Sequence, residues 1–440
     1  MQVALERANA LGMKAADGLA DRSVVEYRRA YAIRRELRTA PGGFRLEGWH
    51  LIHHVMTTIL WQPTAEQVAR SNLSAFMRFV AGRGHPAMCD YASLYDWSNA
   101  EPAAFWSSVW DFCGVVVGQR YDQVVEHFDR MPGARWFPGA RLNYAENLLR
   151  FRDDREAIVF ANERGQRSAL THEQLAQAVG RAGAALRAAG IVAGDRVAGY
   201  LPNLPEAVIA MLATSSIGAI WSSCSPDFGV QGVLDRFRQI GPKVLFAVDG
   251  YVDNSRRVEA RERVAEVCRQ IGSIERLVVV GYLDAPRPNI ESLPLDILPR
   301  AVAWDDFLSS VPAGPIAFEQ LPADHPLYIL YSSGTTGAPK CIVHTAGGIL
   351  LKHLSEHALH GDLRRDDRLF YFTSTGWMMW NWLVGALAVG CTVVLYDGSP
   401  LAPQVDVLFD LAERERLTVF GTNPKYLSVI EKVRLEPART

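Results

Sequence analysis

A run of hydroxyl-bearing residues and glycines ends in a lysine in the C-terminal third of the chain. It follows the apolar segment 326–331 and reads Ser332, Ser333, Gly334, Thr335, Thr336, Gly337, Ala338, Pro339 and Lys340. Glycines let backbone N–H groups approach an anion closely, hydroxyls add further donors, and the lysine adds a positive charge. We therefore predict a loop that binds nucleotide phosphates through Ser332, Ser333, Gly334, Thr335, Thr336, Gly337 and Lys340.

Two other interpretations of this run are weaker. In the Walker pattern of P-loop ATPases four residues separate the glycines, whereas only two separate Gly334 from Gly337, and Pro339 precedes the lysine. A flexible linker between domains is also rich in Gly, Ser and Thr, but such linkers seldom follow a fully apolar strand and seldom end in Pro-Lys. The pattern favours a nucleotide site at the end of a buried strand.

Strand-length apolar segments alternate with helical patterns from about residue 156 onward. We predict strands at 157–161, 196–201, 219–223, 243–248, 277–280, 328–331, 369–372, 392–396 and 418–420. We predict helices at 171–189, 206–217, 230–240, 258–271, 347–360, 382–389 and 405–414, the first with a capping box formed by Thr171 and Gln174. Such alternation specifies parallel sheets covered by helices on both faces, so a ligand is expected beyond the carboxyl ends of the strands.

Composition limits the class of partner. With 440 residues, 49% of them hydrophobic, and a formal charge of -2, the chain has ample core and no basic field to attract nucleic acid or anionic membrane. Six scattered cysteines and an N-terminus without a leader pattern favour a cytoplasmic location. The uncharged stretch 369–396 is long enough to cross a bilayer, but Gly376 and Gly390 divide it into shorter elements. We expect small-molecule partners only, and the oligomeric state is left open.

Two N-terminal segments differ from the rest. Residues 1–55 carry a basic segment that we predict to be helical and form an atypical extension, for which a misassigned start is one hypothesis. Residues 56–150 are rich in tryptophan, and we expect most of these rings to pack in the core: Trp61, Trp97, Trp106, Trp110 and Trp136. Residues 151–440 hold the alternating elements and the predicted phosphate loop.

Several segments resemble a known family. Segment 331–340 resembles the phosphate-loop signature of the adenylate-forming superfamily, which includes acyl-CoA synthetases. Segment 371–382, Tyr-Phe-Thr-Ser-Thr-Gly-Trp-Met-Met-Trp-Asn-Trp, resembles the wall of that superfamily's acyl pocket. Together with segments 136–147, 340–344 and 394–400, they make the chain from about residue 60 onward most similar to the acetoacetate–CoA ligase family.

The resemblance implies a fold and a reaction. The fold is the large N-terminal α/β domain of these enzymes, with stacked, largely parallel sheets flanked by helices, and residues 151–440 form the AMP-binding (adenylation) domain. In the reaction, ATP with Mg²⁺ activates acetoacetate as an acyl-adenylate, and coenzyme A then displaces AMP. Lys340 and Thr335 take the catalytic role of stabilising charge on the phosphates. Trp377, Met378 and Asn381 form the substrate pocket, in which Asn381 donates a hydrogen bond to the ketone oxygen.

Departures from the superfamily pattern leave alternatives open. Ala338 and Cys341 replace residues usual in the loop, and we expect Cys341 to be a small buried thiol rather than a nucleophile. The chain ends at Thr440, before the small C-terminal domain and its acylation-step lysine, so we expect an incomplete fragment with negligible ligase turnover. No residue is assigned as a metal ligand. The alternatives are a ligase for acetate, propionate or a branched acid, and a non-catalytic protein that binds a nucleotide or coenzyme A. For coenzyme A, only Arg236 and Arg238 are suggested as phosphate contacts.

Overall fold

The computed structural model describes residues 61–85, 87–284, 288–294, 296–297, 300–312, 314–332 and 337–437. The chain divides into two compact units, Met1–Thr64 and Ala65–Thr440, and the elements below belong to the second. The predicted extension 1–55 and four residues of the predicted loop lie outside the described residues; these four are Ser333, Gly334, Thr335 and Thr336.

A seven-stranded sheet carries the predicted loop. Its strand order is β12-β11-β8-β6-β7-β14-β15. All neighbours are parallel except β14 and β15, which are antiparallel. The strands are β6 (Arg196–Tyr200), β7 (Ile220–Cys224), β8 (Val244–Val248), β11 (Arg276–Val280), β12 (Ala301–Ala303), β14 (Pro326–Ser332) and β15 (Lys340–Thr345). Strands β7 and β8 are buried along their whole length, as expected for a parallel sheet covered on both faces.

A five-stranded sheet lies beside it, with the order β18-β16-β17-β4-β5. Here only the pair β4 and β5 is antiparallel. The strands are β4 (Glu156–Asn162), β5 (Arg167–Thr171), β16 (Arg368–Tyr371), β17 (Thr392–Asp397) and β18 (Val419–Gly421). The predicted α/β fold with largely parallel sheets is confirmed.

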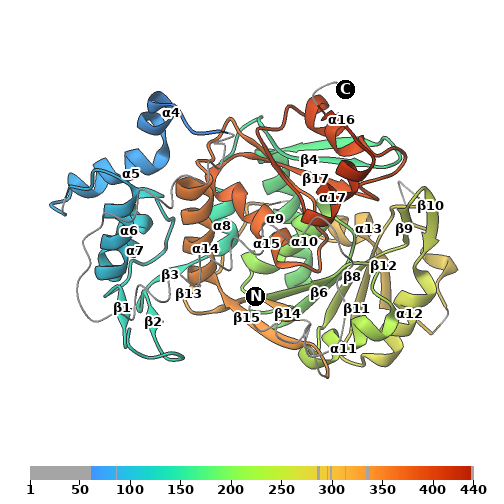
Figure 1. The fold of residues 1–440 in the computed structure, drawn as a ribbon. Helices are drawn as coiled ribbons and strands as arrows, with labels where there is room; N and C mark the ends of the chain where they lie inside the picture. The colour runs from blue at the N-terminus through green and yellow to red at the C-terminus, as the bar shows by residue number, and fades with distance from the viewer. Residues whose placement is uncertain are drawn as a thin grey trace, which may run out of the picture. The chain divides into compact units, whose positions relative to one another are not determined.

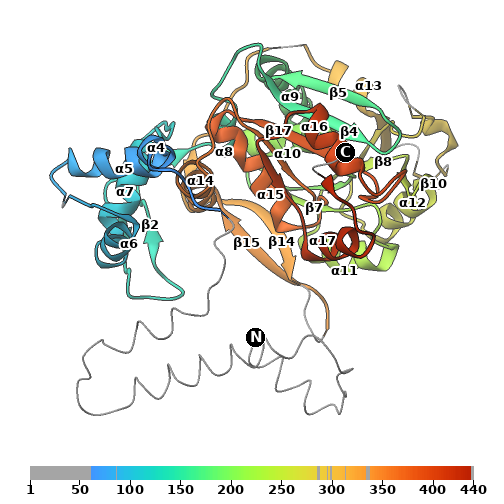
Figure 2. The same cartoon turned by 45° about the horizontal axis from the view of Figure 1, so that its top comes forward.

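Helices fill the space between the sheets and cover their outer faces (Figures 1 and 2). Helix α10 (Pro205–Ser216) packs between α9 (His172–Ala188) and the large sheet, and nearly all of its residues are buried. A second core lies under α11 (Val230–Ile240) and α12 (Arg261–Gln270), and a third under α16 (Val407–Arg414) and α17 (Pro424–Lys432). The predicted capping box at Thr171 and Gln174 is present.

The tryptophan-rich segment folds as short helices, one small hairpin and a short strand that pairs with a strand far along the chain. Its helices are α4 (Ala65–Arg70), α5 (Asn72–Ala81), α6 (Tyr91–Ala100), α7 (Pro102–Phe112) and α8 (Tyr144–Leu148). Strand β1 (Val125–Glu126) pairs with β2 (Arg135–Trp136), and β3 (Arg141–Leu142) pairs with β13 (Leu321–Pro322). Trp97 and Trp110 are buried in the core as predicted, whereas Trp61 is 72% exposed, so the prediction is wrong there.

The uncharged stretch 369–396 forms separate elements rather than one span. It contains β16, α15 (Met378–Gly385), the 3₁₀ turn η5 (Ala386–Val389) and β17. Gly390 ends the 3₁₀ turn with a left-handed φ of 79°. Across the described residues, none of the helices is both long and apolar enough to cross a bilayer.

Some predicted boundaries are wrong. Residues 258–259 belong to the hairpin of β9 (Gly250–Asp253) and β10 (Arg256–Glu259), whose turn residues Asn254 and Ser255 have positive φ values. The helix predicted at 347–360 is α14 (Ala346–Leu354) followed by a π-helical segment, η4 (Ser355–His360). A short helix, α13 (Trp304–Ser309), and a 3₁₀ turn, η2 (Ile290–Ser292), were not predicted.

Candidate functional site

The base of the predicted phosphate loop is formed by the last pair of an antiparallel ladder. Ser332 at the end of β14 pairs directly with Lys340 at the start of β15. Residues directly opposite each other in an antiparallel pair place their side chains on the same face. The Ser332 hydroxyl and the Lys340 ammonium therefore project from the same side of the sheet, the first partly buried and the second exposed. This pair lies at the carboxyl end of β14, where a ligand of a parallel sheet is expected.

Gly337 lies on the lysine side of the loop and needs to be glycine. Its φ of +87° is in the left-handed region, and a Cβ added there would meet no atom within 4 Å. The requirement is therefore one of backbone conformation and not of space.

Gln239 of α11 anchors the lysine side of the loop. Its Nε2 donates to the Pro339 carbonyl at 2.8 Å, and its Oε1 accepts from the Cys341 thiol at 3.5 Å. Cys341 is exposed, so the expectation of a buried thiol is wrong. Desolvation still raises the pKa of the Cys341 thiol, which argues against a thiolate nucleophile at this position.

An arginine also lies near the end of β14. The Arg236 guanidinium lies 4.7 Å from the ring centre of Phe228 and 5.7 Å from that of Tyr331. The Tyr331 hydroxyl in turn accepts a hydrogen bond from the Ser222 hydroxyl at 3.0 Å. Sequence analysis considered Arg236 only as a coenzyme A contact. Its closeness to Tyr331 depends on how α11 packs on the sheet, which the sequence does not show.

The segment between β16 and α15 joins the second sheet to the strand ends of the first. The Ser223 hydroxyl donates to the Thr375 carbonyl at 2.7 Å, and the Thr375 hydroxyl donates to the Leu201 carbonyl at 2.7 Å. Gly376 lies close to Phe228 and to the Ser225 amide. These contacts hold the start of α15 at the carboxyl ends of β6 and β7.

The three residues predicted to bind substrate lie at or in helix α15, with Trp377 as its N-cap. Trp377 and Met378 are 62% and 50% exposed, whereas Asn381 is fully buried. Trp380 is also buried, and its indole Nε1 donates to Asn203 at 2.9 Å, so this ring is a structural anchor. The helix therefore presents Trp377 and Met378 to solvent and turns Asn381 inward.

The Asn381 amide has no protein partner among the described residues. Neither its Oδ1 nor its Nδ2 accepts or donates a hydrogen bond there. An unsatisfied buried amide costs about 1–3 kcal/mol, so a retained one is expected to meet a polar group. Its hydrogen-bonding capacity is thus free, although the side chain is not exposed in this conformation.

An aromatic cluster beneath α15 was missed by the sequence analysis. The Trp382 ring lies between His357, at 4.4 Å between ring centres, and Tyr371, at 6.0 Å. Trp382 is one helical turn from Met378 and lies on the same side of the helix. Tyr371 and Trp382 both belong to the sequence motif 371–382. His357 lies outside this motif, and only the three-dimensional packing shows that it contacts Trp382.

Comparison with known proteins assigns the family. Residues 145–439 match the family model for the AMP-binding enzyme, and residues 91–148 match that for the acetyl-coenzyme A synthetase N-terminus. The chain belongs to the AMP-binding enzyme family. The predicted loop and α15 both lie within the matched range.

Relatives of the chain include several acetoacetyl-CoA synthetases. The chain is 50% identical over 382 residues to acetoacetyl-coenzyme A synthetase of Rhizobium meliloti (strain 1021), covering 87% of this chain and 57% of the relative. It is 39% identical over 392 residues to a malonamoyl-CoA synthetase of Penicillium aethiopicum, covering 85% and 54%. The solved acetoacetyl-CoA synthetase of Streptomyces lividans superposes with a TM-score of 0.81 at 42% identity, covering 86% and 57%. The chain thus spans a little over half the length of these relatives.

A second polar region of the chain lies beside the hairpin of β9 and β10. A cavity of about 270 Å³ is lined by Glu163, Arg164, Val252, Ser255 and Arg257. Both carboxylate oxygens of Glu163 are engaged, since they accept from the amides of Ser255 and Ser399 at 2.7 and 2.8 Å. Burial raises the pKa of the nearby Asp397 carboxyl to about 7.

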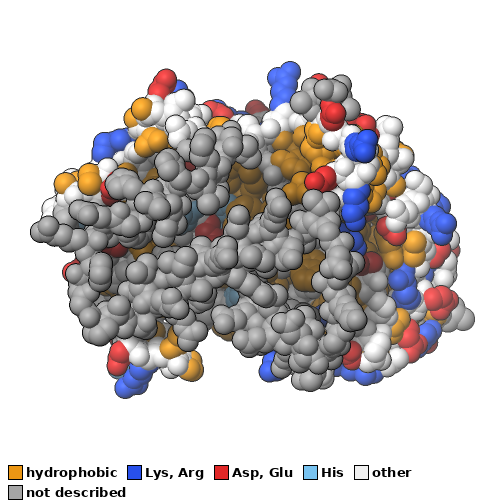
Figure 3. Space-filling view, viewed as in Figure 1, with side chains coloured by type: hydrophobic (Ala, Val, Ile, Leu, Met, Phe, Trp, Pro, Cys, Tyr) orange, Lys and Arg blue, Asp and Glu red, His pale blue; other side chains and the backbone are white. Residues whose placement is uncertain are grey.

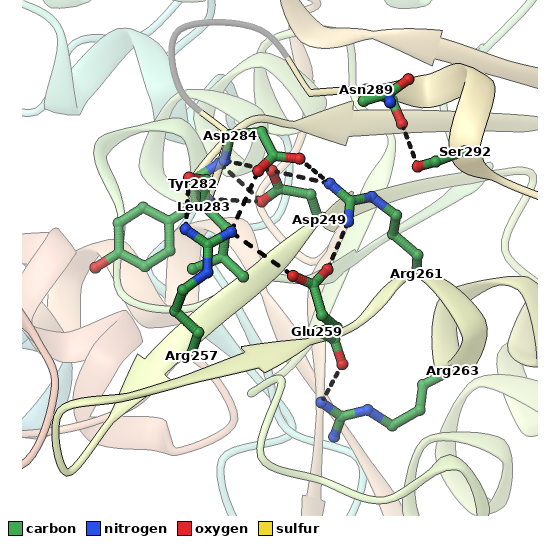
Figure 4. Close-up of polar contacts among 10 residues, drawn as sticks. All are labelled: Asp249, Arg257, Glu259, Arg261, Arg263, Tyr282, Leu283, Asp284, Asn289 and Ser292. Atoms are coloured by element: carbon green, nitrogen blue, oxygen red, sulfur yellow. Dashed lines mark hydrogen bonds and ion pairs between the residues drawn. The ribbon is translucent and has the colours of Figure 1, made fainter.

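Asp249 organises the loop that follows β11 beside this cavity (Figure 4). Its fully buried carboxylate accepts from the backbone amides of Tyr282, Leu283 and Asp284 at 2.8 to 2.9 Å. Arg261 reaches Asp249, Glu259 and Asp284 around it. Figure 3 shows acidic and basic side chains interspersed along this edge of the surface, on the right of the view. These hydrogen bonds and ion pairs around Asp249 form a network, which we call the clamp.

Proposed function

We propose that this chain serves the ATP-dependent ligation of acetoacetate to coenzyme A through an acyl-adenylate. The observation that carries the proposal is the paired placement of Ser332 and Lys340 at the end of β14, within a family match that covers residues 145–439. The 50% identity to an acetoacetyl-coenzyme A synthetase supports the choice of acid.

The proposed reaction has two steps, adenylation of the acid and transfer of the acyl group to coenzyme A. First, a carboxylate oxygen of acetoacetate bonds to the α-phosphorus of ATP, the bond from that phosphorus to the bridging oxygen breaks, and pyrophosphate leaves. Second, the sulfur of coenzyme A, having lost its proton, bonds to the acyl carbon, and AMP leaves with the former carboxylate oxygen. Both steps demand stabilisation of charge on phosphate oxygens and alignment of the reacting groups.

The loop supplies the groups that the first step needs. Lys340 and Thr335 are proposed to stabilise the phosphates, assisted by the hydroxyls and amides of the neighbouring loop residues Ser332, Ser333, Gly334, Thr336 and Gly337. Among the described residues, no group of three or more histidine, cysteine or carboxylate side chains could hold a metal. Mg²⁺ is proposed to accompany ATP, and no step here is assigned to the ion.

The acyl group is proposed to lie against α15. Trp377 and Met378 offer apolar surface at the open side of this helix, and the free amide of Asn381 offers a hydrogen bond to the ketone oxygen. Because Asn381 is fully buried, its contact with the ketone requires neighbouring side chains to move when the acid binds. Such a donor favours acetoacetate over butyrate, since the amide stays unpaired against the acid that lacks the ketone.

A second candidate acid follows from one relative. The malonamoyl-CoA synthetase of Penicillium aethiopicum, 39% identical to this chain, acts on an acid that carries a carbonyl at the same carbon as acetoacetate. We propose that the substrate class is a short acid with a carbonyl at C3.

All six cysteines are free, which supports the proposed cytoplasmic location. The proposed activation of acetoacetate belongs to lipid and ketone-body metabolism.

Binding of stable acyl-adenylate mimics tests the proposal. Isothermal titration would compare acetoacetyl-sulfamoyladenosine with butyryl-sulfamoyladenosine on the whole chain. We expect the acetoacetyl compound to bind at least about tenfold more tightly, and the Asn381→Leu variant to lose this preference. Equal affinity for both mimics in the unchanged protein would overturn the choice of acid, and no affinity for ATP or either mimic would overturn the function.

A further inference from the structure

His357 is buried in η4 and is not among the residues that the proposed function uses. The π-helical segment η4 extends α14, and α14 lies beside α15 in both ribbon views. Single π-helical turns often occur at functional sites because they redirect side chains. Here the turn accompanies an inward-facing His357, whose exposed fraction is 0%.

The His357 ring holds a backbone carbonyl of α15. Its Nε2 lies 2.9 Å from the Trp382 carbonyl oxygen. Because a carbonyl oxygen only accepts, Nε2 must carry the proton, and this fixes the neutral tautomer. In a continuing α-helix the Ala386 amide would donate to this carbonyl, but it donates to Leu383 and Val384 where α15 tightens into η5. His357 thus satisfies a carbonyl at the transition between two kinds of helix.

The same His357 ring also packs against the Trp382 indole. The rings of His357 and Trp382 are 4.4 Å apart between centres, and Tyr371 packs on Trp382 at 6.0 Å. Trp382 and the half-exposed Met378 are four residues apart on one side of α15. Any shift of the Trp382 ring therefore changes the space beneath the proposed acyl group.

His353, one turn earlier on α14, makes the fit to α15 specific. A Cβ added to Gly385 would lie 2.3 Å from the His353 Nδ1, so the histidine ring occupies the space left by the glycine. The rings of His353 and His357 are 5.9 Å apart. Burial lowers the pKa of both, that of His357 to about 4, so both are neutral at physiological pH.

We propose that His357 is a positioning residue for the acyl pocket, which sets the length of acid accepted by holding Trp382 through the Nε2–H bond and the ring contact. The inference rests on the proposed function for the identity of the ligand. It adds a residue that touches neither substrate nor nucleotide and acts only through Trp382. A histidine that served core packing alone would affect stability without changing the preference for acyl length.

Two substitutions separate positioning from packing. His357→Gln keeps an N–H donor near the Nε2 position, whereas His357→Leu removes it and retains apolar bulk. His172→Leu is the matched control, because His172 is also buried and its ring packs on Phe151 rather than on α15. Calorimetry would measure the affinities for acetoacetyl- and hexanoyl-sulfamoyladenosine and for ATP.

In the His357→Leu variant, we expect the preference for the acetoacetyl over the hexanoyl mimic to fall about tenfold, the size of effect that small pocket changes produce. His357→Gln and His172→Leu should keep the preference within about twofold, and ATP affinity should stay unchanged in all three. An unchanged preference in a folded His357→Leu protein would overturn the proposal, as would equal losses in the Leu and Gln variants.

Hydrogen exchange provides a readout that needs no ligand. We expect amides of residues 378–389 to exchange faster in His357→Leu than in His357→Gln, because only the former releases the Trp382 carbonyl. If the unchanged protein binds no acyl-adenylate mimic, the proposed function fails, and the exchange data then decide the positioning role alone. Equal protection of these amides in both variants would contradict it.

Discussion

Ser332 and Lys340 face each other across the last pair of the β14–β15 ladder, so the two ends of the predicted phosphate loop are held together by a sheet. The loop between them can therefore present its donors from a fixed base. Preorganised donors stabilise developing charge without having to be ordered during the reaction.

Gly337→Ala tests the backbone of this loop. Because φ is +87° and no atom lies within 4 Å of the added Cβ, the variant should lose about 1 kcal/mol of stability through backbone strain alone. ATP affinity should fall as well. Gly165→Ala, at φ +73° with equally open space, is the matched control and should lose similar stability with no change in ATP affinity. Urea unfolding and calorimetry measure both quantities, and equal ATP affinity in the two variants would contradict a role for Gly337 in binding.

Gln239→Leu tests the anchor on α11. Losing the bond to the Pro339 carbonyl should weaken ATP binding by roughly fivefold, since a neutral hydrogen bond contributes about 1 kcal/mol. Gln231→Leu is the control, because Gln231 lies on the same helix and bonds only to Asp235 among the described contacts. If the two variants bind ATP equally well, the anchor has no functional role.

Asp397 predicts a dependence of stability on pH. Burial raises its pKa to about 7 from the ordinary value of 3.8, so between these two pH values the native state holds a proton that the unfolded chain releases. Its contribution to stability is full below about pH 4 and is lost as the pH rises through about 7. The difference in unfolding free energy between Asp397→Asn and the unchanged protein should therefore shift in favour of Asn by at least about 1 kcal/mol from pH 5 to pH 8. A difference that does not vary with pH would rule this out.

Buried histidines act in the opposite direction over part of the same range. The folded pKa of His357 is about 4, so acidification from about 6.5 protonates the unfolded chain first and lowers stability. Comparing Asp397→Asn with the unchanged protein cancels this effect, because His357 is present in both.

Asp249→Asn tests the clamp beside the β9–β10 hairpin. The carboxylate accepts three backbone amides, and hydrogen bonds to a charged group contribute about 1.5–3 kcal/mol each. The amide can accept only some of these bonds and brings donors without partners, so a loss of at least about 2 kcal/mol is expected from urea unfolding. Asp253→Asn, on the exposed part of the hairpin, should change stability by less than about 0.5 kcal/mol. If Asp249→Asn lowered the free energy of unfolding by no more than Asp253→Asn does, the clamp would not be stabilising.

The alternating core of the fold could be predicted from sequence because each buried element has a clear period. Val230–Ile240 was predicted with its observed bounds, and a left-handed glycine, Gly241, ends it. The helix predicted at 258–271 was wrong at residues 258–259, which belong to β10 and pair with the neighbouring strand of a partly exposed hairpin. Strand β15 was missed because it is a mostly exposed edge strand and so lacks the buried apolar pattern that marks the other strands.

The candidate site was only partly predictable, because some of its residues are brought together by tertiary packing. Ser332, Gly337 and Lys340 lie in one short motif, so their types and spacing indicated phosphate chemistry without a structure. The grouping of His357, Trp382 and Tyr371 depends on three separate elements packed together, and no local pattern reports it. Burial of Asn381 also depends on tertiary packing around α15, which the sequence motif does not specify.

Calorimetric titration of ATP into Lys340→Ala is the most direct test of the central claim that this loop binds nucleotide phosphates. Lys352→Ala is the matched control, because Lys352 is exposed on α14 and pairs with Glu356. We predict that Lys340→Ala weakens ATP binding by at least about tenfold, the loss expected for a charged hydrogen bond, while adenosine binding and Lys352→Ala stay unchanged. Unchanged ATP affinity in a folded Lys340→Ala protein would contradict the claim.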